Sequence, residues 1–382
     1  NQKNTPLEQI RLRPDTHVGS VEKHTQTLWV YEEGAMVHRS VTYIPGLYKI
    51  FDEILVQAAD NLQRYPSMDS LRVDIDVERC CISVYNTGNG VPVEIHQEEG
   101  LYVPEMMRSG NGAILANIFS MEFIVETADG RRQKKYKQVF SENMGKKSDP
   151  EITKCEPSEN WTRVTFKPDL AKFNMTELDN DAVALMRKQV VDMAGTLGET
   201  VMVELNGEKL SAKSFLEYVQ LYIDSAFKEG IELPRIFQRV NDRWDVCVSL
   251  SEGQFQQVSF VNRIATVRGG THVDYVADQV ANHVMGVVNK RNKHANMKLH
   301  TVKGYLWVFV NVVINNPTFD SQTKETLTTH QGSFGSKCEL SEDFLNRVSN
   351  SGVVSKLLSL AEFRLSKELN KTDGSKRTSF VA

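Results

Sequence analysis

Apolar residues recur at helical spacing along residues 45–65 and predict a long helix that begins at a Pro-Gly pair. Within it, Glu53, Gln57 and Asn61 are each separated by one helical turn, so the three side chains share one face. A helix that packs against a sheet usually buries apolar residues instead. This row of one carboxylate and two amides therefore indicates either a solvated face or a site that holds a ligand, a water and a metal ion.

In the rest of the first half, alternation of apolar and polar residues predicts several strands. Glycine-rich segments interrupt the pattern twice, once directly after a strand and once within a helical run at residues 102–119. The predicted strands occupy residues 71–76, 81–85, 123–127, 136–140 and 162–166, and a helix follows at residues 179–197.

The second half repeats this mixture of helices and strands, so the predicted fold class is α+β with two domains. A boundary is expected between residues 203 and 233, and we divide the chain into domains at 1–210 and 211–382. Strands are predicted at residues 244–250, 257–261 and 306–314, and helices at 273–290 and 351–369.

Composition adds few constraints. Of the 382 residues, 40% are hydrophobic and 25% are charged, as in ordinary soluble globular proteins, and no apolar run is as long as a membrane span. The net charge of −4 predicts no general attraction to nucleic acid, so any such contact must come from local basic clusters. The five cysteines form no CxxC pair, and we expect free thiols.

The polar row on the first helix is suited to phosphate hydrolysis. Mg²⁺ takes few protein ligands and keeps several waters, so one amide oxygen plus the phosphates of a ligand would suffice to bind it. A neighbouring carboxylate, Glu53, would then act as general base toward the attacking water.

Two glycine loops could contact such a ligand. Gly88 and Gly90, directly after a strand, let the backbone approach a flat ligand, and Asn86 could pair with the edge of a base. The same residues are also common in β-turns. The second loop, at residues 108–113, leads into a helix whose free N–H groups could bind an anion. The P-loop and Rossmann glycine spacings are both absent.

A fourth motif lies far downstream. Lys324, in the segment Ser-Gln-Thr-Lys after a predicted strand, could reach a γ-phosphate from another domain. Taken alone, it is an exposed charge.

The order of these motifs resembles the GHKL ATPases, and specifically the ATPase region of the eukaryotic type IIA DNA topoisomerases. The resemblance runs nearly end to end and is greatest to the plant enzymes. It implies a GHKL (Bergerat) ATPase sandwich followed by an α/β transducer domain. The segments that carry it are residues 12–16, 45–53, 117–120, 255–262, 269–273 and 322–325.

The resemblance implies a role for each matching residue. Glu53 is the base that activates water, while Gln322 and Lys324 sense the γ-phosphate. Gln57 stands at the Mg²⁺-binding position. The remaining matches are residues expected to bind ATP, namely Asn61, Asn86, Gly88, Gly90, Arg108, Gly110, Gly112, Ala113 and Thr162.

The resemblance also implies partners and a cellular role. Lys290, Arg291 and Lys293 match a basic loop that faces double-stranded DNA, although such a loop is also compatible with a merely solvated surface. The implied function is an ATP-operated entrance gate of a topoisomerase II in the nucleus. Two copies form a homodimer on binding ATP and Mg²⁺ and trap a DNA duplex for strand passage, with no membrane partner.

The sequence departs from the family at the ATP site. Gln57 replaces an Asn that binds Mg²⁺, and its extra methylene displaces the amide. In the phosphate-binding lid, Ser109, Asn111 and Ile114 replace Asn, Tyr and Lys, so one cation is lost. A Ser/Asn-rich stretch expected directly before Arg108 is missing, and Asn1 stands where the family has a Tyr.

These departures predict weak ATP binding and slow or absent hydrolysis. An alternative function is a diverged dimerisation or DNA-associated module with a crippled ATP site. A mismatch-repair or chaperone ATPase is a further alternative, which the Gln-Thr-Lys loop and residues 255–262 disfavour.

Overall fold

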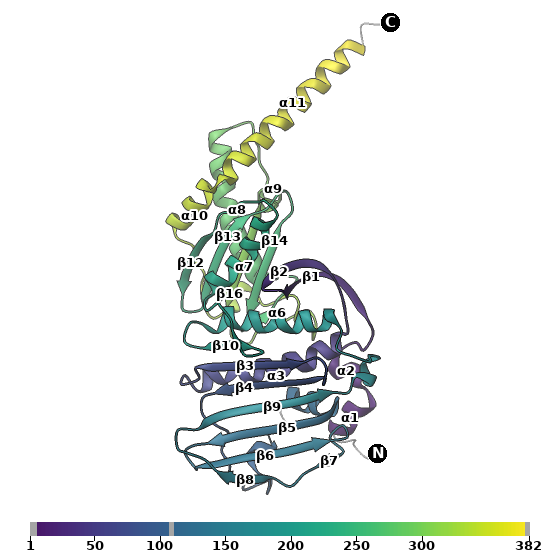
Figure 1. The fold of residues 1–382 in the computed structure, drawn as a ribbon. Helices are drawn as coiled ribbons and strands as arrows, with labels where there is room; N and C mark the ends of the chain where they lie inside the picture. The colour runs from purple at the N-terminus through teal and green to yellow at the C-terminus, as the bar shows by residue number, and fades with distance from the viewer. Residues whose placement is uncertain (1–5, 107–110, 379–382) are drawn as a thin grey trace. The chain divides into compact units, whose positions relative to one another are not determined.

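The computed structural model describes residues 6–106 and 111–378 and divides the chain into two compact units (Figure 1). The first unit ends at Leu221 and the second begins at Tyr222, so the division falls within helix α7 (Phe215–Lys228). Each unit combines its own sheet with its own buried core, in agreement with the predicted α+β class. The domain boundary placed between residues 210 and 211 stays a prediction.

The first unit is built on a nine-stranded sheet with the strand order β11-β10-β3-β4-β9-β5-β6-β7, and β8 also pairs with β6. Neighbouring strands are antiparallel except for β10 and β3, which are parallel. All the strands predicted for this half are present. The strands are β3 (Ser70–Asp76), β4 (Cys81–Thr87), β5 (Ser120–Asp129), β6 (Lys134–Ser141), β7 (Lys146–Lys147), β8 (Glu151–Lys154), β9 (Asn160–Pro168), β10 (Met202–Leu205) and β11 (Glu208–Lys209).

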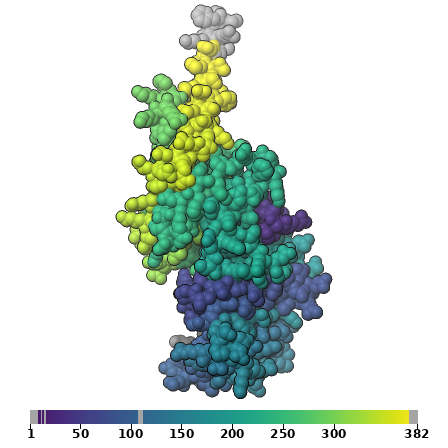
Figure 2. Space-filling view, turned by 60° about the vertical axis from the view of Figure 1, so that its left-hand side comes forward, coloured from purple at the N-terminus to yellow at the C-terminus, as the bar shows by residue number. Residues whose placement is uncertain are grey.

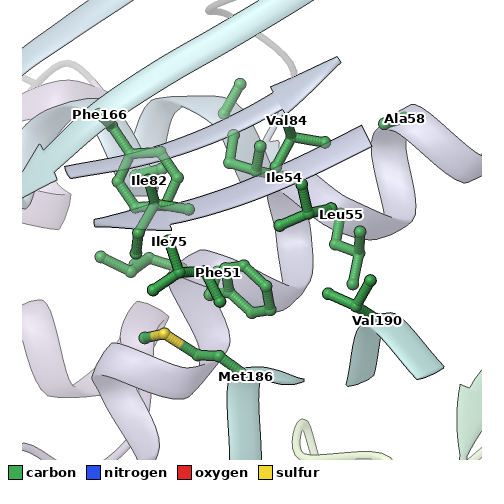
Figure 3. Close-up of a cluster of buried hydrophobic side chains, with 14 of the residues drawn as sticks. Phe51, Ile54, Leu55, Ala58, Ile75, Ile82, Val84, Phe166, Met186 and Val190 are labelled. Carbon is green, nitrogen blue, oxygen red and sulfur yellow. The ribbon is translucent and has the colours of Figure 1, made fainter. Parts of the chain in front are cut away.

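The predicted helix at residues 45–65 is α3 (Pro45–Arg64), which packs against the sheet and against α6 (Asn180–Leu197) (Figure 3). Its apolar face buries Phe51, Ile54 and Leu55 against strands β3 and β4 and against α6. This packing holds α3 rigidly along one side, so the polar residues of its other face are fixed relative to the sheet.

Shorter helices complete the first unit. Within the helical run predicted at residues 102–119 the structure has α4 (Val103–Met106) and α5 (Asn111–Ile118), and residues 107–110, where the glycine break was predicted to begin, lie outside the described residues. The chain begins with α1 (Pro6–Leu12) and α2 (Pro14–Val18), and a short helix η2 (Leu170–Phe173) follows β9.

The sequence patterns did not predict a hairpin formed by β1 (His24–Glu32) and β2 (Ala35–Tyr43). Val30 and Val41 on its inner face are buried against Ala184 and Leu185 of α6. The apolar run at residues 28–31, which includes aromatic and β-branched side chains, was a usable signal, and the turn at Glu33 and Gly34 adopts the positive φ values that tight hairpins require.

The second unit contains a five-stranded sheet with the order β12-β13-β16-β14-β15, in which β14 and β16 are parallel. Helix α8 (Thr271–Arg291) packs on this sheet through Val276, Val280 and Val284, which are all fully buried. The other elements are β12 (Ile236–Asn241), β13 (Trp244–Leu250), β14 (Gln256–Val261), β15 (Ile264–Ala265), α9 (Leu299–Lys303), β16 (Leu306–Val312), η3 (Gln331–Ser333), α10 (Glu342–Val348), η4 (Ser349–Val353) and α11 (Val354–Thr378).

Helix α11 differs from the helix predicted at residues 351–369. It begins later, because Gly352 in the preceding turn has φ of 103°, and it ends later, at Thr378. Figure 2 shows its C-terminal part surrounded by solvent, and Phe363 and Leu369 are 56% and 67% exposed. None of the helices within residues 6–106 and 111–378 combines the length and apolar character needed to cross a bilayer.

Candidate nucleotide-binding site

The polar row of α3 is a continuous stripe of half-buried side chains. Glu53, Gln57 and Asn61 are joined on this stripe by Lys49, one turn earlier, and all four are partly exposed. The Lys49 Nζ atom lies 3.7 Å from Glu53 Oε1. Lys49 was not among the residues predicted for the site, although its position four residues before Glu53 was a usable signal.

The start of helix α5 lies directly against Glu53. A Cβ added to Gly112 would lie 2.4 Å from Glu53 Oε2 and 3.0 Å from Glu53 Cβ, so a larger residue would require the Glu53 side chain to shift. The next residue, Ala113, is buried. The structure therefore places Gly112 against Glu53, and the role of this segment as a phosphate-binding lid stays a prediction. Arg108 and Gly110 of the same prediction lie outside the described residues.

Ile114, which replaces the Lys expected in the lid, is an apolar residue at the edge of the core. Its side chain is partly buried and packs against the core of the first unit. At the other end of the lid, α4 is fixed by the buried carboxylate of Glu105, which accepts a 2.7 Å hydrogen bond from Lys147 of β7. The described part of the lid is thus anchored to the core and to the sheet edge.

Two of the residues predicted to bind adenine lie where β4 and β9 are paired. Asn86 of β4 lies opposite Thr162 of β9, and both are almost fully buried. The Asn86 amide donates to Thr87 O at 2.9 Å. The Thr162 hydroxyl lies 3.1 Å from that of Thr127 on β5, which also accepts a hydrogen bond from Val91 N. The sheet thus joins two predicted adenine-binding residues to the glycine loop.

The glycines of this loop are required by its backbone. Gly88 has φ of 126°, a region that L side chains rarely adopt. A Cβ on Gly90 would lie 1.8 Å from the carbonyl oxygen of Ala128 on β5. Gly90 therefore allows the loop to lie directly on the neighbouring strand β5.

Replacing Gly90 with Ala is expected to lower the free energy of unfolding by about 3 kcal/mol, because the added methyl overlaps a backbone atom that cannot rotate away. Urea denaturation, followed by circular dichroism, measures this. The control is Gly286→Ala in α8, where a Cβ meets nothing within 4 Å and a gain of about 0.5–1 kcal/mol is expected. Equal unfolding midpoints for Gly90→Ala and the unaltered chain would contradict the close approach.

The residues that could hold Mg²⁺ are hard oxygen donors on the α3 stripe. The described residues contain no cluster of three His, Cys, Asp or Glu side chains, so a site built from protein ligands alone is absent there. The amide of Gln57, one turn from the carboxylate of Glu53, suits an ion that takes most of its ligands from water and phosphate. The donor set therefore fits Mg²⁺ in its chemistry, with one methylene more than the family residue.

The other predicted residues belong to the second unit, which is described by itself. Gln322 and Lys324 are exposed in the loop that follows β16. Lys290 and Arg291 are exposed in the last turn of α8, and Lys293 is exposed just after it. Cations at this end of a helix are favoured by its dipole, so these positions are compatible with either a solvated surface or a phosphate contact.

Comparison with known proteins gives consistent matches. A family model described as DNA gyrase B matches residues 211–373. The chain is 65% identical to DNA topoisomerase 2 of Arabidopsis thaliana and 62% identical to that of Pisum sativum, each match covering 98% of the chain. The chain spans 27% of the length of these relatives. The predicted likeness to plant enzymes is thereby confirmed.

A solved structure covers the same region. The ATPase and transducer domains of DNA topoisomerase II from Balamuthia mandrillaris are 42% identical to the chain with a TM-score of 0.87, and the match covers 96% of this chain and 98% of that one. The match to the Arabidopsis protein extends over 397 residues, more than the 382 of the whole chain. The relative thus has residues with no counterpart here, and the stretch missing before Arg108 stays a prediction.

Proposed function

The chain belongs to the family of eukaryotic type II DNA topoisomerases, and from this premise we propose that it operates as their ATP-driven entrance gate. Two copies would dimerise when each binds ATP, and the closed dimer would hold a DNA duplex for passage through another. The chain corresponds to the ATPase and transducer part of such an enzyme. The observation that best supports the proposal is the contact between the lid glycine Gly112 and Glu53 on the α3 stripe.

Within this proposal, each part of the site has a chemical task. Asn86 and Thr162 contact the adenine, and Gly88 and Gly90 give the base room to lie along the strand. Gly112 and Ala113 begin a helix whose free N–H groups bind phosphate oxygens, together with Arg108 and Gly110. Asn61 supports the nucleotide from α3.

Hydrolysis would depend on Glu53. Its carboxylate would accept a proton from the attacking water, and the neighbouring Lys49, 3.7 Å away, would help to orient it. Bound Mg²⁺ supplies charge neutralisation for the phosphates, with Gln57 as its protein ligand. Gln322 and Lys324 would recognise the γ-phosphate, so closure of the gate would depend on the triphosphate.

Turnover in this chain is proposed to be slow. The longer side chain of Gln57 fits Mg²⁺ less well than an Asn would. Ile114 packs in the core and supplies no cation for phosphate. Each missing charged hydrogen bond weakens binding by roughly 1.5–3 kcal/mol before any compensation.

DNA would be contacted through Lys290, Arg291 and Lys293, which attract backbone phosphates without regard to sequence. A homodimer and a nuclear location follow from the same proposal. Identity of 65% to a topoisomerase over nearly the whole chain does not favour the alternative of a module that has lost its ATP site.

The proposal is tested by measuring the molecular mass of the chain with and without a non-hydrolysable ATP analogue. We expect a monomer without nucleotide and a dimer with analogue and Mg²⁺. A chain that remains monomeric at saturating analogue would contradict the gate.

A further inference from the structure

The loop between β16 and α10, which carries Gln322 and Lys324, is folded into a short hairpin. Asp320 N donates to Thr326 O at 3.2 Å, and Thr328 N donates to Thr318 O at 2.9 Å. Two backbone hydrogen bonds therefore join the arm before the tip to the arm after it, and Lys324 lies within the tip.

Lys324 has an unusual backbone conformation. Its φ is 55°, in the left-handed region that residues with a side chain rarely adopt. Its N–H donates to Ser321 O at 3.2 Å, and the Ser321 and Thr323 hydroxyls lie 2.7 Å apart. Such a conformation persists only where surrounding contacts over-determine it.

Those contacts come from the segment just before α8. The Arg268 side chain forms an ion pair with Glu325, the residue after Lys324, with 3.0 Å between Nε and Oε2. Arg268 N also donates to Glu325 O at 3.0 Å. Further along, Leu327 N donates to Gly269 O at 3.1 Å. The tip of the hairpin is thus held by one side-chain contact and by a run of backbone contacts.

Gly270 makes the backbone part of this attachment possible. It has φ of 138°, and an added Cβ would lie 2.4 Å from Leu327 O. Thr271 N donates to that same oxygen at 3.1 Å. The Gly-Gly pair therefore allows two chain segments to lie against each other with no side chain between them.

The segment before α8 is in turn fixed to the core of the second unit. Thr266 is fully buried, and its hydroxyl lies 3.0 Å from His272 Nε2 and 2.5 Å from Ser259 Oγ. Burial lowers the pKa of His272 to about 3, so this histidine is neutral at any pH near 7. The anchor therefore does not change its charge over the physiological range.

We propose that the ion pair between Arg268 and Glu325 is a latch that positions Lys324 for recognition of a γ-phosphate. The inference deepens the proposed function and rests on it, since it takes Lys324 as the group that reads the third phosphate. Arg268 and Glu325 are positioning residues, because they act through the backbone conformation of the hairpin tip. The chemical class they serve is the nucleoside triphosphate rather than the diphosphate.

The solvent exposure of the Arg268–Glu325 ion pair sets how much its loss should change the preference for triphosphate. The Arg268 side chain is 63% exposed and that of Glu325 is 24% exposed, so water screens the pair and the backbone contacts remain when it is broken. Breaking it is therefore expected to reduce the preference for triphosphate over diphosphate by about three- to fivefold.

The test is calorimetric titration of the full chain with ADP and with a non-hydrolysable ATP analogue, each with Mg²⁺. Arg268→Ala and Glu325→Ala are each expected to lower the ratio of the two affinities, while ADP affinity stays unchanged. The conservative variant Arg268→Lys and the reversed pair Arg268→Glu with Glu325→Arg are expected to restore it. A merely structural loss would weaken both nucleotides alike and would overturn the latch.

Two reference variants separate the latch from the proposed function. Lys356→Ala breaks a comparable pair with Glu252, 3.9 Å apart in the same unit, and should change nothing. Lys324→Ala should remove the triphosphate preference. If it does so and the Arg268 and Glu325 variants keep the preference, the latch is wrong. If the unaltered chain shows no preference and Lys324→Ala has no effect, the proposed function itself fails.

Discussion

The variant Glu53→Gln is expected to hydrolyse ATP at least about a hundredfold more slowly than its parent, because a neutral amide cannot accept the proton of the attacking water. The substitution keeps the size and shape of the side chain. Contacts of α3 with the sheet and with α6 are made by the opposite face, so folding should be unaffected. Affinity for a non-hydrolysable ATP analogue should stay within about twofold, since binding does not require the base.

This result is measured by phosphate release in single-turnover conditions, with analogue binding measured in parallel. Because turnover of the unaltered chain is proposed to be slow, the comparison is made in both the unaltered chain and the Gln57→Asn background. Glu78→Gln, an exposed change elsewhere in the same unit, is the matched control. Hydrolysis that persists in Glu53→Gln would remove Glu53 from the mechanism.

The variant Gln57→Asn is expected to hydrolyse ATP at least about tenfold faster than the unaltered chain. Removing one methylene moves the amide back by roughly 1.5 Å, a large distance for an ion that requires near-ideal octahedral geometry. A tenfold gain corresponds to about 1.4 kcal/mol of transition-state stabilisation, within the range of one charge-assisted contact. The half-buried position of Gln57 leaves room for the shorter side chain.

The rate should be measured over a range of Mg²⁺ concentrations, and the gain should be accompanied by a lower concentration for half-maximal activity. The same change at Gln63, exposed near the end of α3, is the control and should have no effect. An unchanged rate and an unchanged Mg²⁺ dependence in Gln57→Asn would show that the amide at this position is not a ligand.

Local patterns predicted the elements that build the site. The helix α3 was predicted because its apolar residues lie at helical spacing with no breaker, and β3 and β4 were predicted from strict alternation. The hairpin of β1 and β2 was not predicted, since its apolar run at residues 28–31 is short and both strands are otherwise largely polar. The hairpin packs on α6, which is far away in the sequence, so no local pattern could predict that contact.

The same distinction applies to the candidate site. The sequence predicted Glu53, Asn86 and Thr162 as site residues, and pairing of β4 with β9 places the last two opposite each other. It showed that Ile114 supplies no cation but not that its side chain packs in the core. The approach of Gly112 to Glu53 and the pair of Arg268 with Glu325 depend on tertiary contacts between distant segments, so no local spacing could predict them.

The central claim is that the chain closes as a dimer in response to ATP, and sedimentation velocity tests it most directly. The chain is run alone, with Mg²⁺ and ADP, and with Mg²⁺ and a non-hydrolysable ATP analogue. The account predicts a monomer in the first two runs and a dimer in the third, with less dimer when Lys324 is replaced by Ala. A monomer in all three runs, or a dimer that forms without nucleotide, would contradict it.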